Sequence, residues 1–124
     1  MGITSAALSA FRVLIVASFK YLELGSSATA FSIAQTALIS AITGNDLARA
    51  AATASAVTTT YTGDTLRLTK TWTAGGSETV REVGIFNASS DGTMGARRVL
   101  DSAYALVEDD EFTYQFDIIF AYKT

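Results

Sequence analysis

The 124-residue chain contains no cysteine, no histidine and no proline. Without cysteine it has no disulfide, no thiolate nucleophile and no cysteine-ligated zinc site. Without histidine it lacks the most common general base and the imidazole metal ligand. These absences exclude most familiar catalytic and metal-binding arrangements. We therefore predict a non-enzymatic protein with no catalytic, metal-binding or cofactor-binding residues.

Charged residues are also scarce. They make up 17% of the chain, against roughly a quarter in ordinary soluble domains, whereas 49% of the residues are hydrophobic. The net charge of −3 supplies no basic field for phosphate backbones, so we expect no nucleic-acid partner. A small domain with so few charges is expected to cover part of its surface with neighbours. We therefore predict a homo-oligomer, with a trimer favoured.

The few charges are unevenly placed. Residues 1–63 carry five charged side chains, and residues 64–124 carry the other sixteen. We expect the first half to be the more covered, including by neighbouring subunits. The charge-free run 24–45 is long enough to span a bilayer, but it contains many serine, threonine and glycine residues. These polar groups oppose insertion, so we expect no membrane partner.

The N-terminal half contains one helix signal and one short strand signal. Apolar residues at the helical spacing i, i+3, i+4, i+7 are Ala7, Leu8, Phe11, Leu14 and Ile15. They predict a helix over about 4–17, which Thr4 or Ser5 could cap. Alternation over 19–24, followed by Gly25-Ser26-Ser27, predicts a short strand that ends in a loop. The stretch 28–52 has poor periodicity and is interpreted as an extended loop with a helical turn.

The remaining residues favour strands. The run 53–62 contains the β-favouring residues threonine, valine and tyrosine. Leu66, Leu68 and Trp72 share one face, and 94–100 is predicted to form another strand. We interpret residues 74–77 (Ala-Gly-Gly-Ser) as a hairpin turn. Large apolar residues then occupy every second position: Phe112, Tyr114, Phe116, Ile118, Phe120 and Tyr122. These patterns predict a single, mainly β domain over 1–124. We expect an antiparallel β-sandwich of about five to seven strands, with a short N-terminal helix and a β-rich part over about 53–123.

Few residue clusters indicate chemistry. The acidic run 108–111 could hold Ca²⁺, but consecutive acids diverge and the run lacks a glycine, so a solvated turn is favoured. Arg97 and Arg98 could pair with a neighbouring chain. We favour one arginine pointing inward to Glu82 and the other pointing to solvent. Trp72 and the tyrosines could stack on a sugar ring, but their alternation favours packing in the core.

Two stretches of the chain resemble a known family. The first is 19–30 (FKYLELGSSATA), followed by Thr36-Ala37-Leu38. The second is 80–87 (VREVGIFN), followed by 92–100 (GTMGARRVL). Together they resemble the glycine stretch and the E-x-G-[IL]-F…G-x-[ML]-x-x-R signature of small tailed-bacteriophage virion structural proteins. In this chain Ser26-Ser27 follows Gly25 where that family has a second glycine.

The signature residues are predicted to determine the fold. They are Glu82, Gly84, Phe86, Gly92 and Arg97. Gly84 would let a neighbouring backbone or a large side chain approach closely, and Glu82 could face Arg97 across a hairpin. We predict that the assembly surface comes from the apolar first half. Its candidate residues are Leu8, Phe11, Leu14, Phe31, Ile33, Leu38 and Ile42.

The resemblance implies a structural component of the virion, assembled in the host cytoplasm. A capsid decoration (cement) protein that contacts the phage major capsid protein is the first expectation, and the absence of cysteine agrees with assembly in a reducing compartment. The alternative is a tail fibre, baseplate or adaptor protein that contacts tail proteins, with host-surface glycan binding. A depolymerase would need paired carboxylates in a cleft, whereas the clustered acids of this chain lie in one run.

Overall fold

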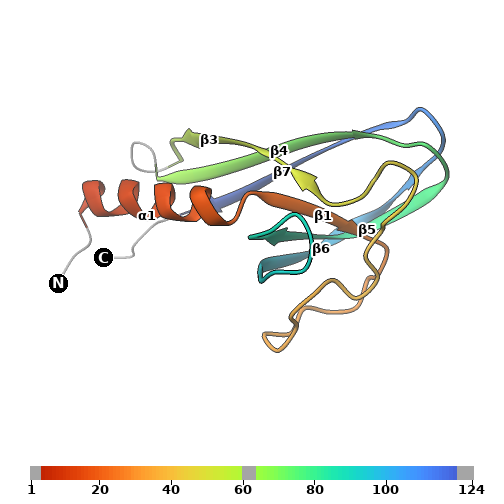
Figure 1. Cartoon of the computed structure of the whole chain (residues 1–124), viewed down its shortest axis with the longest axis horizontal. Coiled ribbons are helices and arrows are strands. Elements are labelled where there is room, and N and C mark those ends of the chain that lie inside the picture. Colours follow the sequence, from red (N-terminus) through yellow and green to blue (C-terminus); the bar gives the residue numbers. More distant parts are fainter. Residues whose placement is uncertain (1–3, 60–63, 120–124) are drawn as a thin grey trace.

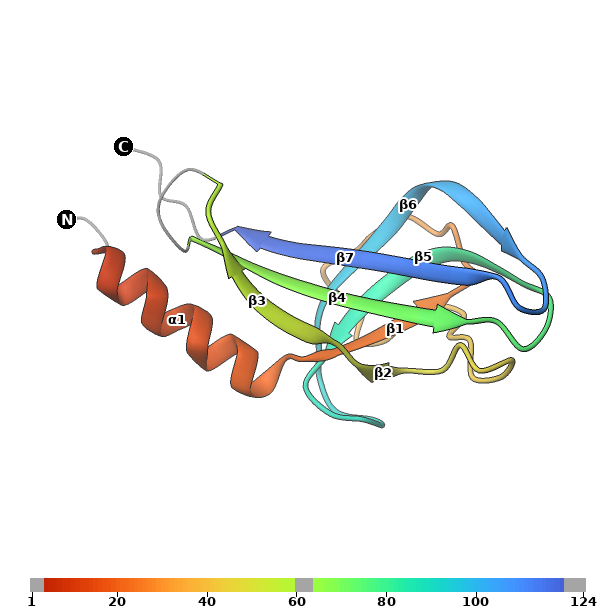
Figure 2. The same ribbon diagram turned by 90° about the horizontal axis from the view of Figure 1, so that it is seen from above.

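The chain folds as two antiparallel sheets packed face to face (Figures 1 and 2). The computed structural model describes residues 4–59 and 64–119. The elements in this part of the chain are α1 (Ser5–Ser18), β1 (Tyr21–Gly25), β2 (Ala50–Ala51), β3 (Thr53–Val57), β4 (Thr65–Thr73), β5 (Glu78–Phe86), β6 (Met94–Leu106) and β7 (Glu111–Ile119). One sheet has the strand order β2-β1-β5-β6 and the other has the order β3-β4-β7. The predicted mainly β sandwich is confirmed.

Helix α1 occupies the residues predicted to be helical and lies at one end of the molecule (Figure 2). The Thr4 hydroxyl caps it by accepting a hydrogen bond from the Ala7 amide at 3.1 Å. Ile15 and Phe19, near its C-terminal end, pack against the core, whereas Leu14 is 66% exposed. Among the described residues, no helix has both the length and the apolar character needed to cross a membrane.

The core lies between the two sheets and follows the predicted alternation. One sheet contributes Leu22, Leu24, Val83 and Ile85, and the other contributes Leu66, Leu68, Trp72 and Phe112. The Trp72 indole donates to the Ala48 carbonyl at 3.0 Å, which satisfies its polar atom inside the protein. Tyr114, Phe116 and Ile118 are half-buried against this core. The predictions for Phe120 and Tyr122 fall outside the described residues.

The predicted hairpin at 74–77 is wrong. Strands β4 and β5 belong to different sheets, so these residues connect the two layers. Ala74 exchanges backbone hydrogen bonds with Asp109 and Asp110, and the Gly75 amide donates to the Asn45 carbonyl at 2.8 Å. A hairpin within one sheet and a connection between two packed sheets both place alternate apolar residues toward one core. The local sequence pattern therefore does not distinguish them.

Two strands differ from their predicted bounds. Strand β3 ends at Val57, before the predicted end at 62, and residues 60–63 fall outside the described part. Strand β6 continues to Leu106, beyond the predicted end at residue 100. It can continue because residues 100–103 bulge opposite Arg81, after which pairing with β5 resumes at Val80↔Tyr104.

The connection from Ser26 to Arg49, called the long loop below, extends away from the sandwich before it returns (Figure 1). It contains turns and bends but no helix, so the helical turn predicted within 28–52 is not found, and residues 50–51 form the short strand β2. The Ser26 amide donates to the Ser40 carbonyl, and the Ile42 amide donates to the Leu24 carbonyl, each at 2.9 Å. These bonds hold the returning part of the loop beside β1.

Candidate functional site

A buried ion pair lies on the side of the β2-β1-β5-β6 sheet that faces away from the core. Glu82 on β5 and Arg97 on β6 come together because the register pairs Gly84 with Arg97 and Glu82 with Val99. The Arg97 Nε lies 2.7 Å from Glu82 Oε2, and both side chains are 0% exposed. The predicted pairing of Glu82 with Arg97 is confirmed, and Arg98 is exposed, as expected.

The ion pair holds the long loop at several points. Glu82 accepts hydrogen bonds from the amides of Ser40 at 2.8 Å and Ile39 at 3.3 Å. Arg97 donates to the Thr29 carbonyl at 2.8 Å and to Gln35 Oε1 at 3.2 Å. Buried charges are tolerated only when their hydrogen-bonding capacity is satisfied. Because the loop supplies most of these partners, the pair and the loop backbone stabilise each other.

A second ion pair fixes the end of the loop. Arg49 lies 2.9 Å from Glu23 on β1, and both side chains are mostly buried. The Arg49 guanidinium stacks 3.6 Å above the centre of the Phe86 ring. Arg49 also donates to the carbonyls of Ala88 at 3.1 Å and Asp91 at 2.7 Å. It therefore connects the long loop, β1 and the turn between β5 and β6.

Sequence reasoning missed this second pair. Glu23 and Arg49 are two of the five charged residues in the first half of the chain, and they are separated by 26 positions. Their rarity in an apolar stretch is the signal that could have singled them out, because an isolated charge near a strand needs a partner. The partner itself could not be chosen without the path of the loop.

The other signature residues surround the same region. Gly84 lies beneath Leu38 of the long loop, which confirms the predicted close approach. Phe86 is buried beneath Arg49. Gly92 has a φ of 73°, a left-handed conformation that favours glycine, in the turn between β5 and β6. The signature residues therefore form the surface against which the long loop packs.

The predicted assembly surface needs a correction at two positions. Leu38 and Ile42 are buried within the chain itself, because the loop returns over Gly84 and beside β1. Leu38 covers Gly84, and Ile42 joins the core. Both therefore contribute to folding and present no surface for assembly. The side chains of Leu8 and Phe11 fall outside the described part of the structure.

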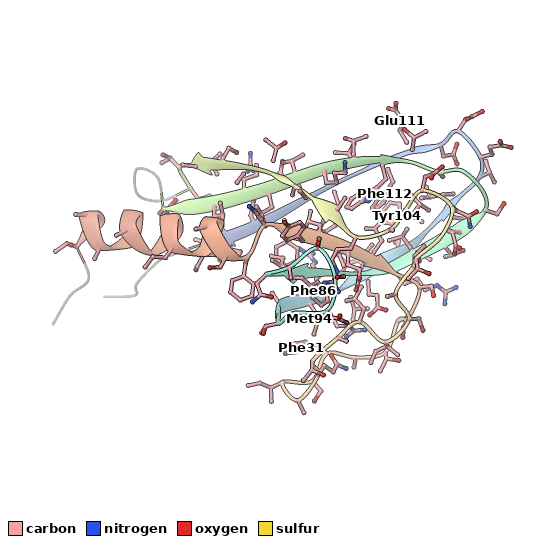
Figure 3. The ribbon with its side chains drawn as sticks, viewed as in Figure 1. Phe31, Phe86, Met94, Tyr104, Glu111 and Phe112 are labelled. Carbon is pink, nitrogen blue, oxygen red and sulfur yellow. The ribbon has the colours of Figure 1, made fainter. Side chains whose placement is uncertain are left out.

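The tip of the long loop exposes two large apolar residues of the predicted surface. Ile33 is 95% exposed and Phe31 is 58% exposed. They border a hollow of about 260 Å³ whose other walls include Gln35, Met94 and Arg97. Figure 3 shows Phe31 and Met94 on the same side of the molecule. The tip thus presents large apolar groups on a backbone that the Glu82–Arg97 pair holds in place.

The acidic run 108–111 forms the turn between β6 and β7. Asp110 accepts a hydrogen bond from the Val107 amide at 2.9 Å, and Asp109 adopts a φ of 72°. Within residues 4–59 and 64–119, no three acidic side chains converge as a metal site requires. The geometry here is that of a tight turn whose side chain satisfies a backbone donor.

Comparisons of the chain with protein-family models, with curated proteins and with solved structures found no match.

Proposed function

We propose that the chain is a structural component of a tailed-bacteriophage virion, placed on the capsid as a decoration protein. One observation carries this proposal: the long loop is fixed at its base by a buried ion pair, while its tip exposes Phe31 and Ile33. A preorganised loop loses little conformational entropy when it docks. Each large apolar side chain buried on docking contributes roughly 1.5–3 kcal/mol.

Helix α1 supports the same role. Leu14 is 66% exposed on a helix whose sequence contains one charged residue, Arg12. Exposed large apolar side chains on a charge-poor element are the kind of group that contact surfaces use. With the loop tip, α1 provides apolar groups for contacts with further copies of the chain and with the major capsid protein. We propose a homo-oligomer on this basis, with a trimer favoured.

The resemblance to phage virion proteins supports the biological setting. Its signature residues form the surface against which the long loop packs. The residues that carry the resemblance are therefore those that hold the proposed docking element in place. The same surface would serve a tail adaptor, baseplate or fibre protein, which is the alternative location within the virion. Neither location requires catalysis by this chain.

Quantitative mass spectrometry of separated heads and tails from the phage that encodes the chain tests the proposal. A decoration protein is expected to remain with the heads in copy numbers comparable to those of the major capsid protein. Recovery with the tails in tens of copies would overturn the capsid location and support the tail role. Absence from purified particles would contradict the virion role altogether. Native mass spectrometry of the free protein tests self-association separately.

A further inference from the structure

The sandwich is open along one side. On the opposite side, β2 and β3 follow each other closely and carry the chain from one sheet to the other. Strands β6 and β7 are the edges of different sheets, and in the described part of the chain they do not pair with each other. Side chains that point inward along these two edges are therefore accessible from the gap between them.

An aromatic row lines this open side. The Tyr104 ring on β6 lies 5.4 Å from the Phe112 ring on β7, and Phe112 lies 6.4 Å from the nearly parallel Tyr114 ring. Phe112 is buried and Tyr114 is half-buried, whereas Tyr104 is 50% exposed. Tyr104, Leu106, Phe112 and Tyr114 border a groove of about 320 Å³. Figure 3 shows Tyr104 beside Phe112, and Glu111 and Thr113 complete the border of the groove.

Hydrogen-bonding groups flank the aromatic row. Glu111 and Thr113 of β7 border the groove. Arg98 and Asp101, both exposed on β6, shift the pKa of the Tyr114 phenol in opposite directions, since Arg98 lowers it and Asp101 raises it. The two tyrosine hydroxyls and the unpaired backbone edge of β7 supply further donors and acceptors. The groove therefore combines an apolar floor with donors and acceptors along one rim.

We infer that this groove, called the β6–β7 groove below, binds a saccharide. The apolar C–H face of a sugar ring packs on an aromatic face, and its hydroxyls need donors and acceptors such as the Glu111 carboxylate and the Thr113 hydroxyl at the border of the groove. Its volume lies near the lower end of ligand pockets, about 300–1,000 Å³, which suits one or two sugar rings. The inference gives a site to the glycan binding expected of the tail alternative, and its test does not depend on where in the virion the chain lies.

An added peptide strand fits these edges less well. Residues 100–103 of β6 bulge out of register, and Arg98 and Asp101 place charges on the edge. Bulges and edge charges are the devices by which proteins prevent strand addition. A sugar ring can cover the exposed face of Tyr104 without pairing in register with a strand. The groove therefore suits a saccharide better than an extended peptide.

Saturation-transfer NMR of the full chain tests the inference with D-glucose, D-galactose, N-acetylglucosamine, maltose and lactose as probes. We expect at least one of them to bind. Tyr104→Ala should weaken this binding about tenfold, because it removes the stacking surface. Tyr104→Phe should keep the affinity within about threefold, since the ring remains. Phe31→Ser is the matched control, because it removes an exposed aromatic ring outside the groove and should leave binding unchanged.

The thermal unfolding midpoint of each variant shows that the fold is intact. Absence of binding for all five sugars would overturn the inference. Binding that Tyr104→Ala leaves unchanged would overturn it too, because the sugar would then lie elsewhere. An unstructured decapeptide serves as a competing probe: if it alone binds, and Tyr104→Ala abolishes its binding, the groove is a peptide site. None of these outcomes affects the association of the chain with virions.

Discussion

Leu38 covers Gly84 so closely that position 84 has no room for a side chain. A Cβ atom built on Gly84 would lie 2.8 Å from Leu38 Cδ2 and 2.9 Å from Phe86 Cε2. Both neighbours are buried, so neither can move without disturbing other contacts. The absence of a side chain on β5 thus lets a residue from the long loop, 46 positions away in sequence, pack against the sheet.

Gly84→Ala is expected to destabilise the fold by about 1–3 kcal/mol through overpacking. The free energy of unfolding from urea denaturation measures the effect. Gly44→Ala is the matched control, because a Cβ at Gly44 meets nothing within 4 Å. It should change stability by no more than about 0.5 kcal/mol. Equal losses in the two variants would contradict the packing role assigned to Gly84.

Arg97→Met is expected to cost about 3–5 kcal/mol, because it leaves the Glu82 carboxylate buried without its partner. The Thr29 carbonyl and Gln35 Oε1 each also lose the hydrogen bond that Arg97 donates. Urea denaturation measures the loss of stability. Limited proteolysis should in addition cleave the long loop faster than in the unchanged protein.

Arg67→Met is the control for this ion-pair prediction. Arg67 donates to Asp117 through two hydrogen bonds of 2.9 Å on the outer face of the second sheet. The Asp117 partner raises the pKa of Arg67, but both side chains are partly exposed to water. Exposed pairs contribute little, so the loss should be clearly smaller than for Arg97→Met. Similar losses would show that burial of the Glu82–Arg97 pair does not matter.

Alternation along the strands is the part of the fold that the sequence predicted well. It placed Leu66, Leu68 and Trp72 on one face, which is the core face, and anticipated the pairing of Glu82 with Arg97. These assignments succeed because a strand repeats its side-chain direction every two residues. They depend only on neighbouring positions and one short connection.

The path of the long loop could not be predicted in this way. Leu38 and Ile42 look like surface residues in a charge-poor loop, yet they are buried by contacts with β1 and β5. The Glu23–Arg49 pair likewise depends on where the loop ends. Such contacts are set by tertiary packing over long sequence separations, for which local periodicity gives no signal.

Ile33→Asp tests the loop tip as a docking element. Ile33 is 95% exposed, so the substitution should change the free energy of unfolding by no more than about 0.5 kcal/mol. It should lower the number of copies per purified particle, because a charge would have to be buried in an apolar contact. Ser77→Asp, an exposed change in the connection between the sheets, is the matched control. Unchanged occupancy with Ile33→Asp would contradict docking through the tip.

Ionisation of Tyr114 is expected to lower the free energy of unfolding at alkaline pH. Burial beside Phe112 and Phe116 raises its pKa, and the nearby Arg98 lowers it by less. The pKa of Tyr114 is therefore higher in the folded chain than in the unfolded chain, where it is about 10. The contribution of Tyr114 to stability is complete below about pH 10. It is lost as the pH rises through the folded pKa. Urea denaturation at about pH 8 and about pH 11 should therefore show a smaller alkaline loss for Tyr114→Phe than for the unchanged protein. Equal pH dependence of Tyr114→Phe and the unchanged protein would show that the Tyr114 phenol ionises alike in the folded and unfolded chains.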